Sequence, residues 1–208
     1  MREKFKNILS EFLPENAVAL IVEWIIQYKI NLKITKKRIT KFGDYRPPAN
    51  NSTHKITVNG NLNNYSFLIT LVHEISHLVC WNECEKRTKP HGKSWKENFK
   101  KLMFPFLNEK IFPEEILLSL NKYLNNPAAS TLSDTELMRI LMKYDNDTAG
   151  DLKFTLIENI PDNLFFEIPS GRKFRKIKKI RKRYRCIEID TNRIYLFNPL
   201  ANVIALDN

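Results

Sequence analysis

Long apolar runs are missing from this chain of 208 residues. No segment approaches the roughly eighteen uncharged apolar residues that a transmembrane helix needs. The N-terminal segment MREKFKNILSEFLPEN carries charges and a proline where a signal peptide requires an apolar stretch and a cleavage site. We therefore expect a cytoplasmic protein with no transmembrane segment.

Cysteine is also scarce. The three cysteines, Cys80, Cys84 and Cys186, cannot all pair with one another, and in a reducing compartment they are expected to be free thiols. No CxxC pair occurs anywhere, and no internal repeat is present at periods of about 20 to 50 residues. A disulfide scaffold and a repeat protein are thereby both excluded.

What the chain does contain is typical of a globular protein. Its apolar content of 43% is enough to bury a core in one medium domain, or in one domain with a small appendix. Its formal net charge of +11 is large for this length. Such an excess favours nucleic acid or another polyanion as a partner.

Hydrophobic spacing predicts a helical first part of the chain. The expected helices cover residues 2–12, 15–28, 66–80, 94–103 and 113–124. Alternation of apolar and polar residues within 31–40 and 54–59 predicts two or three strands, with breaks at Gly43 and at Pro47-Pro48.

A linker begins at Pro127 and leads to a different pattern. Ser133 and Glu136 form a capping box that predicts a short helix ending near Tyr144. Beyond Gly150, short segments separated by turn residues predict a small antiparallel sheet of about 55 residues. These segments lie near 152–158, 164–168, 184–190, 193–198 and 202–206. Its expected core is Phe154, Leu164, Phe165, Phe166, Ile187, Tyr195 and Phe197.

The segment His73-Glu-Ile-Ser-His77 is an HExxH motif within the predicted helix 66–80. On a helix, its two histidines lie one turn apart on the same face and can share one metal ion. The flanking residues are mostly apolar, and burying a polar cluster among them costs free energy unless its groups are hydrogen-bonded or bind a metal ion. The motif therefore predicts a zinc site with His73 and His77 as ligands.

A third zinc ligand is expected downstream of the motif. Catalytic zinc commonly has three protein ligands and keeps a fourth position for water. His91 is the candidate, because Pro90 and Gly92 permit a sharp turn and Ser94 can cap a following helix.

Other roles follow from this arrangement. Glu74 would act as general base, taking a proton from the zinc-activated water and delivering it to the leaving amine. If His91 is not a ligand, Glu83, Glu85 or Glu97 would supply the third one. His54 lies in a strand pattern and is expected to be structural.

These residues resemble the SprT-like family of zinc metallopeptidases, in which an HExxH helix is followed by a pattern such as His91-Gly-Lys-Ser-Trp95. Three further segments resemble that family's approach to its active site, so the resemblance covers roughly residues 15–125. They are Gly43-Asp-Tyr-Arg-Pro, Ile56-Thr-Val-Asn59 and Asn61-Leu-Asn.

The resemblance implies that His73, His77 and His91 bind a single zinc ion and that Glu74 is catalytic. Spartan-type members cleave proteins crosslinked to DNA and use DNA as an activator, and the family often has a zinc ribbon after the peptidase domain. The absence of any CxxC pair here argues against a second zinc.

The expected fold class is therefore α+β. A zincin-like helical peptidase domain with a small antiparallel sheet would occupy residues 1–126. A linker with a short helix would follow over 127–150, and a small all-β basic module, ribbon-like but metal-free, over 151–208.

A dense basic stretch lies in the predicted β-module. Ten Lys or Arg and no acid occur within fourteen residues: Arg172, Lys173, Arg175, Lys176, Lys178, Lys179, Arg181, Lys182, Arg183 and Arg185. The interleaved Phe174, Ile177, Ile180 and Tyr184 would anchor the stretch while the cations face phosphates, without sequence specificity. The alternatives are a solubilising hairpin or a contact with an anionic membrane.

The substrate is expected to be an extended or unfolded polypeptide. Zinc peptidases of this kind pair such a substrate with the edge of a small sheet, and strand 54–59, with Ile56 and Val58, is the candidate edge. One alternative is a non-catalytic, zinc-stabilised protein that binds nucleic acid or acts as an adaptor. Another is a metal-dependent hydrolase of something other than peptides, because the same ligands activate water for many electrophiles.

Overall fold

The computed structural model describes residues 2–38, 41–49, 53–83, 89–128, 134–145 and 154–206. The chain divides into two compact units, Met1–Asp145 and Asn146–Asn208. The first combines helices with a small sheet and the second is a sheet alone, so the predicted α+β class with a β-module is confirmed. No helix among these residues has the length and apolar character needed to cross a bilayer.

Two short helices open the first unit, close to where hydrophobic spacing predicts them. Helix α1 (Arg2–Leu9) ends earlier than expected, and α2 (Glu15–Gln27) begins directly after Pro14. Proline suits this position, because it has no N–H to leave unpaired at a helix start. The apolar face of α2 is buried through Ala17, Val18, Ile21, Val22 and Ile25.

Three strands form the sheet of the first unit in the order β1-β3-β2. They are β1 (Asn31–Thr35), β2 (Gly43–Arg46) and β3 (Lys55–Asn59). The sheet is mixed, because β3 runs parallel to β1 and antiparallel to β2. The prediction of an antiparallel sheet is thus wrong for one of the two pairings, and Gly43 begins a strand instead of breaking the chain.

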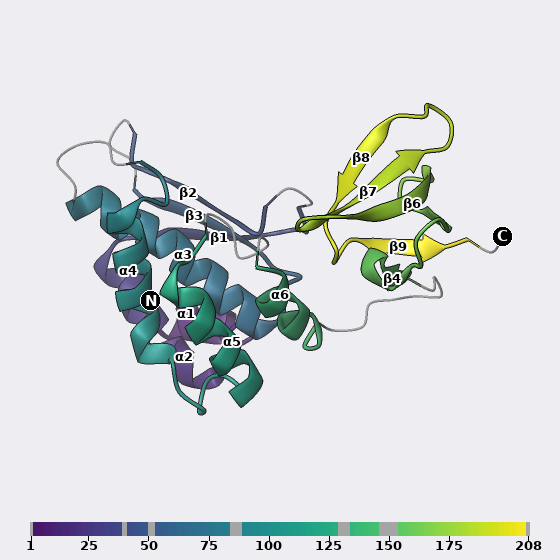
Figure 1. The fold of residues 1–208 in the computed structure, drawn as a ribbon. Coiled ribbons are helices and arrows are strands. Elements are labelled where there is room, and N and C mark those ends of the chain that lie inside the picture. The colour runs from purple at the N-terminus through teal and green to yellow at the C-terminus, as the bar shows by residue number, and fades with distance from the viewer. Residues whose placement is uncertain are drawn as a thin grey trace. The chain divides into compact units, whose positions relative to one another are not determined.

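Helix α3 (Asn64–Glu83) packs against β2 and β3 and is buried along most of its length. Its apolar residues occur on every side, as expected of a helix enclosed by other elements. Asn63 caps it by accepting a hydrogen bond from the Ser66 N–H at 2.8 Å. In Figure 1 the helices of this unit gather on one face of the three-stranded sheet.

Three further helices complete the first unit: α4 (Lys93–Met103), α5 (Glu114–Asn125) and α6 (Thr135–Met142). All three lie where the sequence predicts helices, although the cap of α6 differs. Asp134 accepts hydrogen bonds from the N–H groups of Glu136 and Leu137. Ser133, the predicted cap, lies outside the described residues.

The second unit contains a six-stranded sheet in the order β4-β9-β5-β6-β7-β8, with every pairing antiparallel. The strands are β4 (Phe154–Leu156), β5 (Phe165–Glu167), β6 (Lys173–Ile180), β7 (Arg183–Glu188), β8 (Ile194–Phe197) and β9 (Asn202–Ala205). A 3₁₀ turn, η3 (Ile157–Asn159), follows β4. Strand β6 was not among the predicted segments, although a hairpin was one alternative for the basic stretch.

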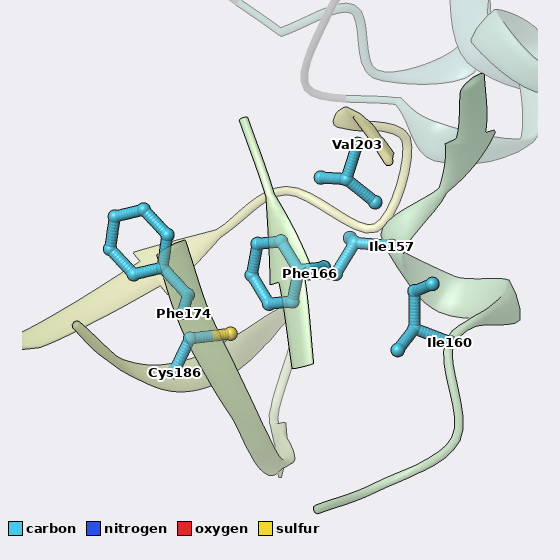
Figure 2. Close-up of a cluster of buried hydrophobic side chains, with 6 residues drawn as sticks. All are labelled: Ile157, Ile160, Phe166, Phe174, Cys186 and Val203. Carbon is cyan, nitrogen blue, oxygen red and sulfur yellow. The ribbon is translucent and has the colours of Figure 1, made fainter. Parts of the chain in front are cut away.

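A small apolar cluster forms the core of this sheet (Figure 2). It consists of Ile157, Ile160, Phe166, Phe174, Cys186 and Val203, with Leu164, Tyr195 and Phe197 packed against it. The prediction is correct for Phe166 and for these three neighbours, but wrong for Phe154, which is 39% exposed. Cys80 and Cys186 are both buried thiols.

Candidate functional site

The HExxH motif lies in the middle of α3, where the helix is buried. His73 and His77 project from the same side of this helix, and their ring centroids are 5.1 Å apart. His73 is almost fully enclosed and His77 is half-buried. The motif is thus held by a rigid element, with its imidazoles close enough to act together.

His91 reaches the same place from the turn before α4. Its backbone is left-handed (φ 57°), a conformation that costs a residue with a side chain about 1 kcal/mol or more. Gly92 follows as the N-terminal cap of α4, and its N–H donates to the carbonyl of Lys89 at 2.9 Å. This turn brings Nε2 of His91 to 3.2 Å from Nε2 of His73 and 2.9 Å from Nε2 of His77.

The three imidazoles suit a tetrahedral metal ion. All three ligand atoms lie within 4.8 Å of one another. Zinc–nitrogen bonds of about 2.0–2.1 Å separate tetrahedral nitrogen ligands by roughly 3.3 Å, close to the two separations around His91. Among the described residues, these histidines are the one group of three or more potential ligands that meets in this way.

The protonation of the histidines also favours a cation. Burial lowers the pKa of His73 to about 3 and that of His77 to about 4, with a smaller effect from the neighbouring histidines, and burial also lowers the pKa of His91. The rings are therefore neutral at pH 7. At most one hydrogen can lie between two such nitrogens, so nitrogen lone pairs point toward one another. A cation at the point where they converge would bind these lone pairs.

Trp95 lies against all three histidines. Its ring centroid is 4.5 Å from that of His73, 5.3 Å from that of His77 and 4.7 Å from that of His91. Trp95 itself is buried and stacks on Phe99 at 5.2 Å. The ring of Trp95, supported by Phe99, restricts the rotation of the imidazoles. Trp95 is part of the sequence pattern, but no role was predicted for it from the sequence.

Glu74 lies beside the histidines with its carboxylate against β2. The backbone N–H of Tyr45 donates a hydrogen bond to it, and the side chain is 7% exposed. Burial raises the pKa of Glu74 to about 8, and the charge of Asp44 adds to this effect. A divalent cation held by the adjacent histidines would favour the charged carboxylate and so oppose the shift.

The fourth histidine of the chain also belongs to this neighbourhood. Nδ1 of His54 is 3.0 Å from the hydroxyl of Tyr45, and the Tyr45 ring is parallel to that of His77, with an interplanar angle of 4°. His54 was expected to be structural only. The link through Tyr45 could not be read from spacing, since it joins three separate segments.

Two of the alternative metal ligands, Glu83 and Glu97, do not join the cluster. The carboxylate of Glu83 accepts a hydrogen bond from Asn98 at 2.8 Å, and Glu97 is exposed on α4. Glu85 lies outside the described residues.

The predicted substrate strand requires a correction. Strand β3 lies between β1 and β2, and Ile56 and Val58 are fully buried. Its backbone groups are used by neighbours on both sides, so it cannot accept a further strand there. The prediction failed because alternation reveals which side chains are buried but not the order of strands. Strand β2, which contacts Glu74, is an edge of the sheet.

The basic stretch folds into the hairpin of β6 and β7. Eight of its ten cations are exposed: Arg172, Lys173, Arg175, Lys178, Lys179, Arg181, Lys182 and Arg183. Arg172, although exposed, forms an ion pair with Glu188 at 2.5 Å. Arg185 is half-buried opposite Lys178.

Lys176 contradicts the expectation that all the cations face outward. Its side chain is 3% exposed, and its ammonium donates to the carbonyl of Ile160 and lies 3.9 Å above the ring of Tyr184. The carboxylate of Asp162 lies 3.6 Å away. Lys176 thus joins β6 to the segment after η3 and is not available to an external partner.

The first unit is thus an α+β fold in which an HExxH helix under a small mixed sheet and the turn before α4 bring together three histidines that could hold a metal ion. The model of one family, described as the SprT-like family, matches residues 6–115, which is just over half of the chain. The chain belongs to the SprT-like family. No curated protein and no solved structure matches it in the same comparisons.

Proposed function

We propose that this protein is a zinc-dependent metallopeptidase that binds one zinc ion through His73, His77 and His91. The observation that carries the proposal is the convergence of three neutral imidazole nitrogens beside the buried carboxylate of Glu74. Membership of the SprT-like family supports it. In this proposal, residues 1–126 are the peptidase domain, 127–150 the linker and 151–208 the basic β-module, in a cytoplasmic protein.

Glu74 is the proposed general base and acid. Bound zinc would acidify a water molecule and polarise the scissile carbonyl. Glu74 accepts the proton of the attacking water at its carboxylate and delivers it to the leaving amine. The N–H of Tyr45 fixes the orientation of this carboxylate, while burial keeps bulk water away from it.

The proposed substrate is an extended or unfolded polypeptide that pairs with β2. This strand is an edge of the sheet and contacts Glu74 through Gly43 and Tyr45, so a strand added there would pass close to the histidines. Recognition through backbone hydrogen bonds gives affinity with little sequence selectivity.

Glu74→Gln tests the peptidase proposal, because it keeps the shape of the side chain but removes its basicity. Casein, or a protein crosslinked to DNA, would be incubated with each variant, with and without single-stranded DNA and a chelator. We expect a rate about 10²–10⁴-fold lower for Glu74→Gln, as for loss of a general base. Glu23→Gln, an exposed change on α2, should cleave like the wild type.

Equal, chelator-insensitive cleavage by the wild type and Glu74→Gln would refute the peptidase proposal. Zinc binding and nucleic-acid affinity without turnover would instead favour a non-catalytic, zinc-stabilised adaptor.

We also propose that the β-module binds nucleic acid without sequence specificity. Most of the cations between Arg172 and Arg185 are exposed, and the outward face of the hairpin carries cations in adjacent strands. Such a surface neutralises phosphates regardless of sequence. Lys176 is excluded from this contact because its ammonium is enclosed. A substrate bound or crosslinked to DNA would then be held by both units of the chain.

A further inference from the structure

Tyr45 occupies the space between two histidines that are distant in the sequence. Its ring is parallel to that of His77, with centroids 6.3 Å apart and an interplanar angle of 4°. It also stacks on His54, at 5.9 Å and 22°. These separations fall in the range of offset-stacked aromatic pairs.

His54 holds the hydroxyl end of Tyr45. The hydroxyl and Nδ1 of His54 are 3.0 Å apart. Burial raises the pKa of Tyr45 and lowers that of His54, so both groups are neutral at pH 7 and one hydrogen lies between the phenol oxygen and Nδ1. The backbone of His54 is fixed in turn, because its carbonyl accepts the N–H of Asn31 at 2.8 Å.

As a proposed metal ligand, His77 would need a contact that fixes the orientation of its ring. A histidine that binds a metal is usually oriented by a hydrogen bond to its other ring nitrogen. Within the described parts of the chain, no hydrogen bond to Nδ1 of His77 accompanies its ring contacts. The rings of Tyr45 and Trp95 therefore limit the rotation that would turn Nε2 away from the ligand cluster.

We propose that Tyr45 is a positioning residue of the metal centre: its ring, fixed by the hydrogen bond to His54, orients the imidazole of His77. This inference rests on the proposed metal site, but not on peptidase activity. It gives His54 a role that acts entirely through Tyr45. It also explains why β2 approaches α3 at this point, since one residue supplies both the N–H for Glu74 and the ring for His77.

Binding of cobalt(II) to the metal-free full-length protein tests the inference, with affinity and the visible absorption spectrum as readouts. We expect Tyr45→Leu to bind cobalt about tenfold more weakly, as for the loss of a group that orients a ligand. Tyr45→Phe and His54→Leu should each weaken binding about threefold and change the spectrum similarly, because each removes the same hydrogen bond. The double variant should be no weaker than either single variant, because the two residues act through one interaction.

Two matched variants separate orientation from general damage. His54→Asn keeps a group that can accept or donate a hydrogen bond close to the position of Nδ1 and should bind cobalt like the wild type. Tyr65→Phe alters another half-buried tyrosine on α3, which contacts Phe112 and Tyr144, and should leave cobalt binding unchanged.

Wild-type affinity and spectrum in Tyr45→Leu would overturn the inference, as would additive effects of Tyr45→Phe and His54→Leu. Because cobalt binding needs no turnover, a wild type that binds cobalt but cleaves nothing would refute the peptidase while leaving the role of Tyr45 in place. A wild type that binds no cobalt would refute both.

Discussion

Gly43 lies so close to the carboxylate of Glu74 that a Cβ added to Gly43 would be 2.5 Å from Oε1. The same Cβ would be 2.8 Å from Cγ of Glu74 and 2.8 Å from a methyl group of Thr70. Strand β2 can therefore approach α3 this closely only because residue 43 has no side chain. Gly43 is thus the residue that makes room for the proposed general base.

Gly43→Ala should reduce peptidase activity roughly 10–100-fold, because displacing a reacting group by about 1 Å has effects of this size. Zinc content should stay at the wild-type level, since the atoms nearest to the added Cβ belong to Glu74 and Thr70 and not to a histidine. Peptidase assays and elemental analysis of the same preparation would check both expectations. Full activity in Gly43→Ala would show that Glu74 moves without consequence and would contradict its proposed role.

Removal of the metal should destabilise the first unit. We expect one zinc per chain in the wild type, and little or none in His77→Ala or His91→Ala. Ligand binding to the folded state alone stabilises it by about 4 kcal/mol when the free ligand exceeds its dissociation constant a thousandfold. Elemental analysis and thermal unfolding with and without chelator would measure these effects. Glu97→Gln should retain the metal, because its exposed carboxylate lies outside the histidine cluster.

Acid should weaken the second unit through Glu188. The guanidinium of Arg172 and the hydroxyl of Thr191 lower the pKa of Glu188 from 4.5 to about 2 in the folded state. Between these values the unfolded chain binds the additional proton, so the contribution of Glu188 is complete above about pH 4.5 and is lost as the pH falls toward 2.

Thermal unfolding of the wild type and Glu188→Gln across this pH range would test that relation. The wild type should be the more stable of the two at pH 6, and the difference should shrink as the pH is lowered. Glu167→Gln, on β5, serves as a comparison with the same change of charge. A difference between wild type and Glu188→Gln that stays constant with pH would contradict the prediction.

Affinity for single-stranded DNA should depend on the exposed cations of the hairpin but not on the enclosed Lys176. Lys178→Gln and Arg183→Gln should each weaken binding. Each should also reduce the slope of log affinity against log salt concentration, by up to about one for each phosphate that is no longer neutralised. Lys176→Met removes the same charge but should leave the salt dependence unchanged where the variant is folded. Binding titrations at several salt concentrations would measure this, and equal effects of all three variants would contradict a contact specific to the outer face.

The sequence predicted the helical framework and the convergence of the three histidines correctly because their signals are local. Hydrophobic spacing located α3, and the step of four positions from His73 to His77 places both on one helical face. His91 was expected to return to them because proline and glycine flank it. These inferences needed no knowledge of how distant segments meet.

What the sequence could not show depends on contacts between distant segments. Alternation in β3 does not tell a central strand from an edge, so β3 was mistaken for the substrate edge. The close approach of Gly43 to Glu74, and the bond between Tyr45 and His54, join segments from different elements. A run of cations likewise gave no sign that Lys176 is enclosed, which follows from its place in the sheet and from the carbonyl of Ile160.

The left-handed backbone of His91 would favour His91 as the first of the proposed ligands to leave a bound ion. His73 and His77 lie on a regular helix, whose backbone is not strained. Detachment of His91 would instead let its backbone leave the left-handed region for a conformation of lower energy. An ion would therefore lose His91 first and His73 and His77 last. A new ion would bind to His73 and His77 before His91 joins it. The rate of metal exchange would then depend on the turn that carries His91.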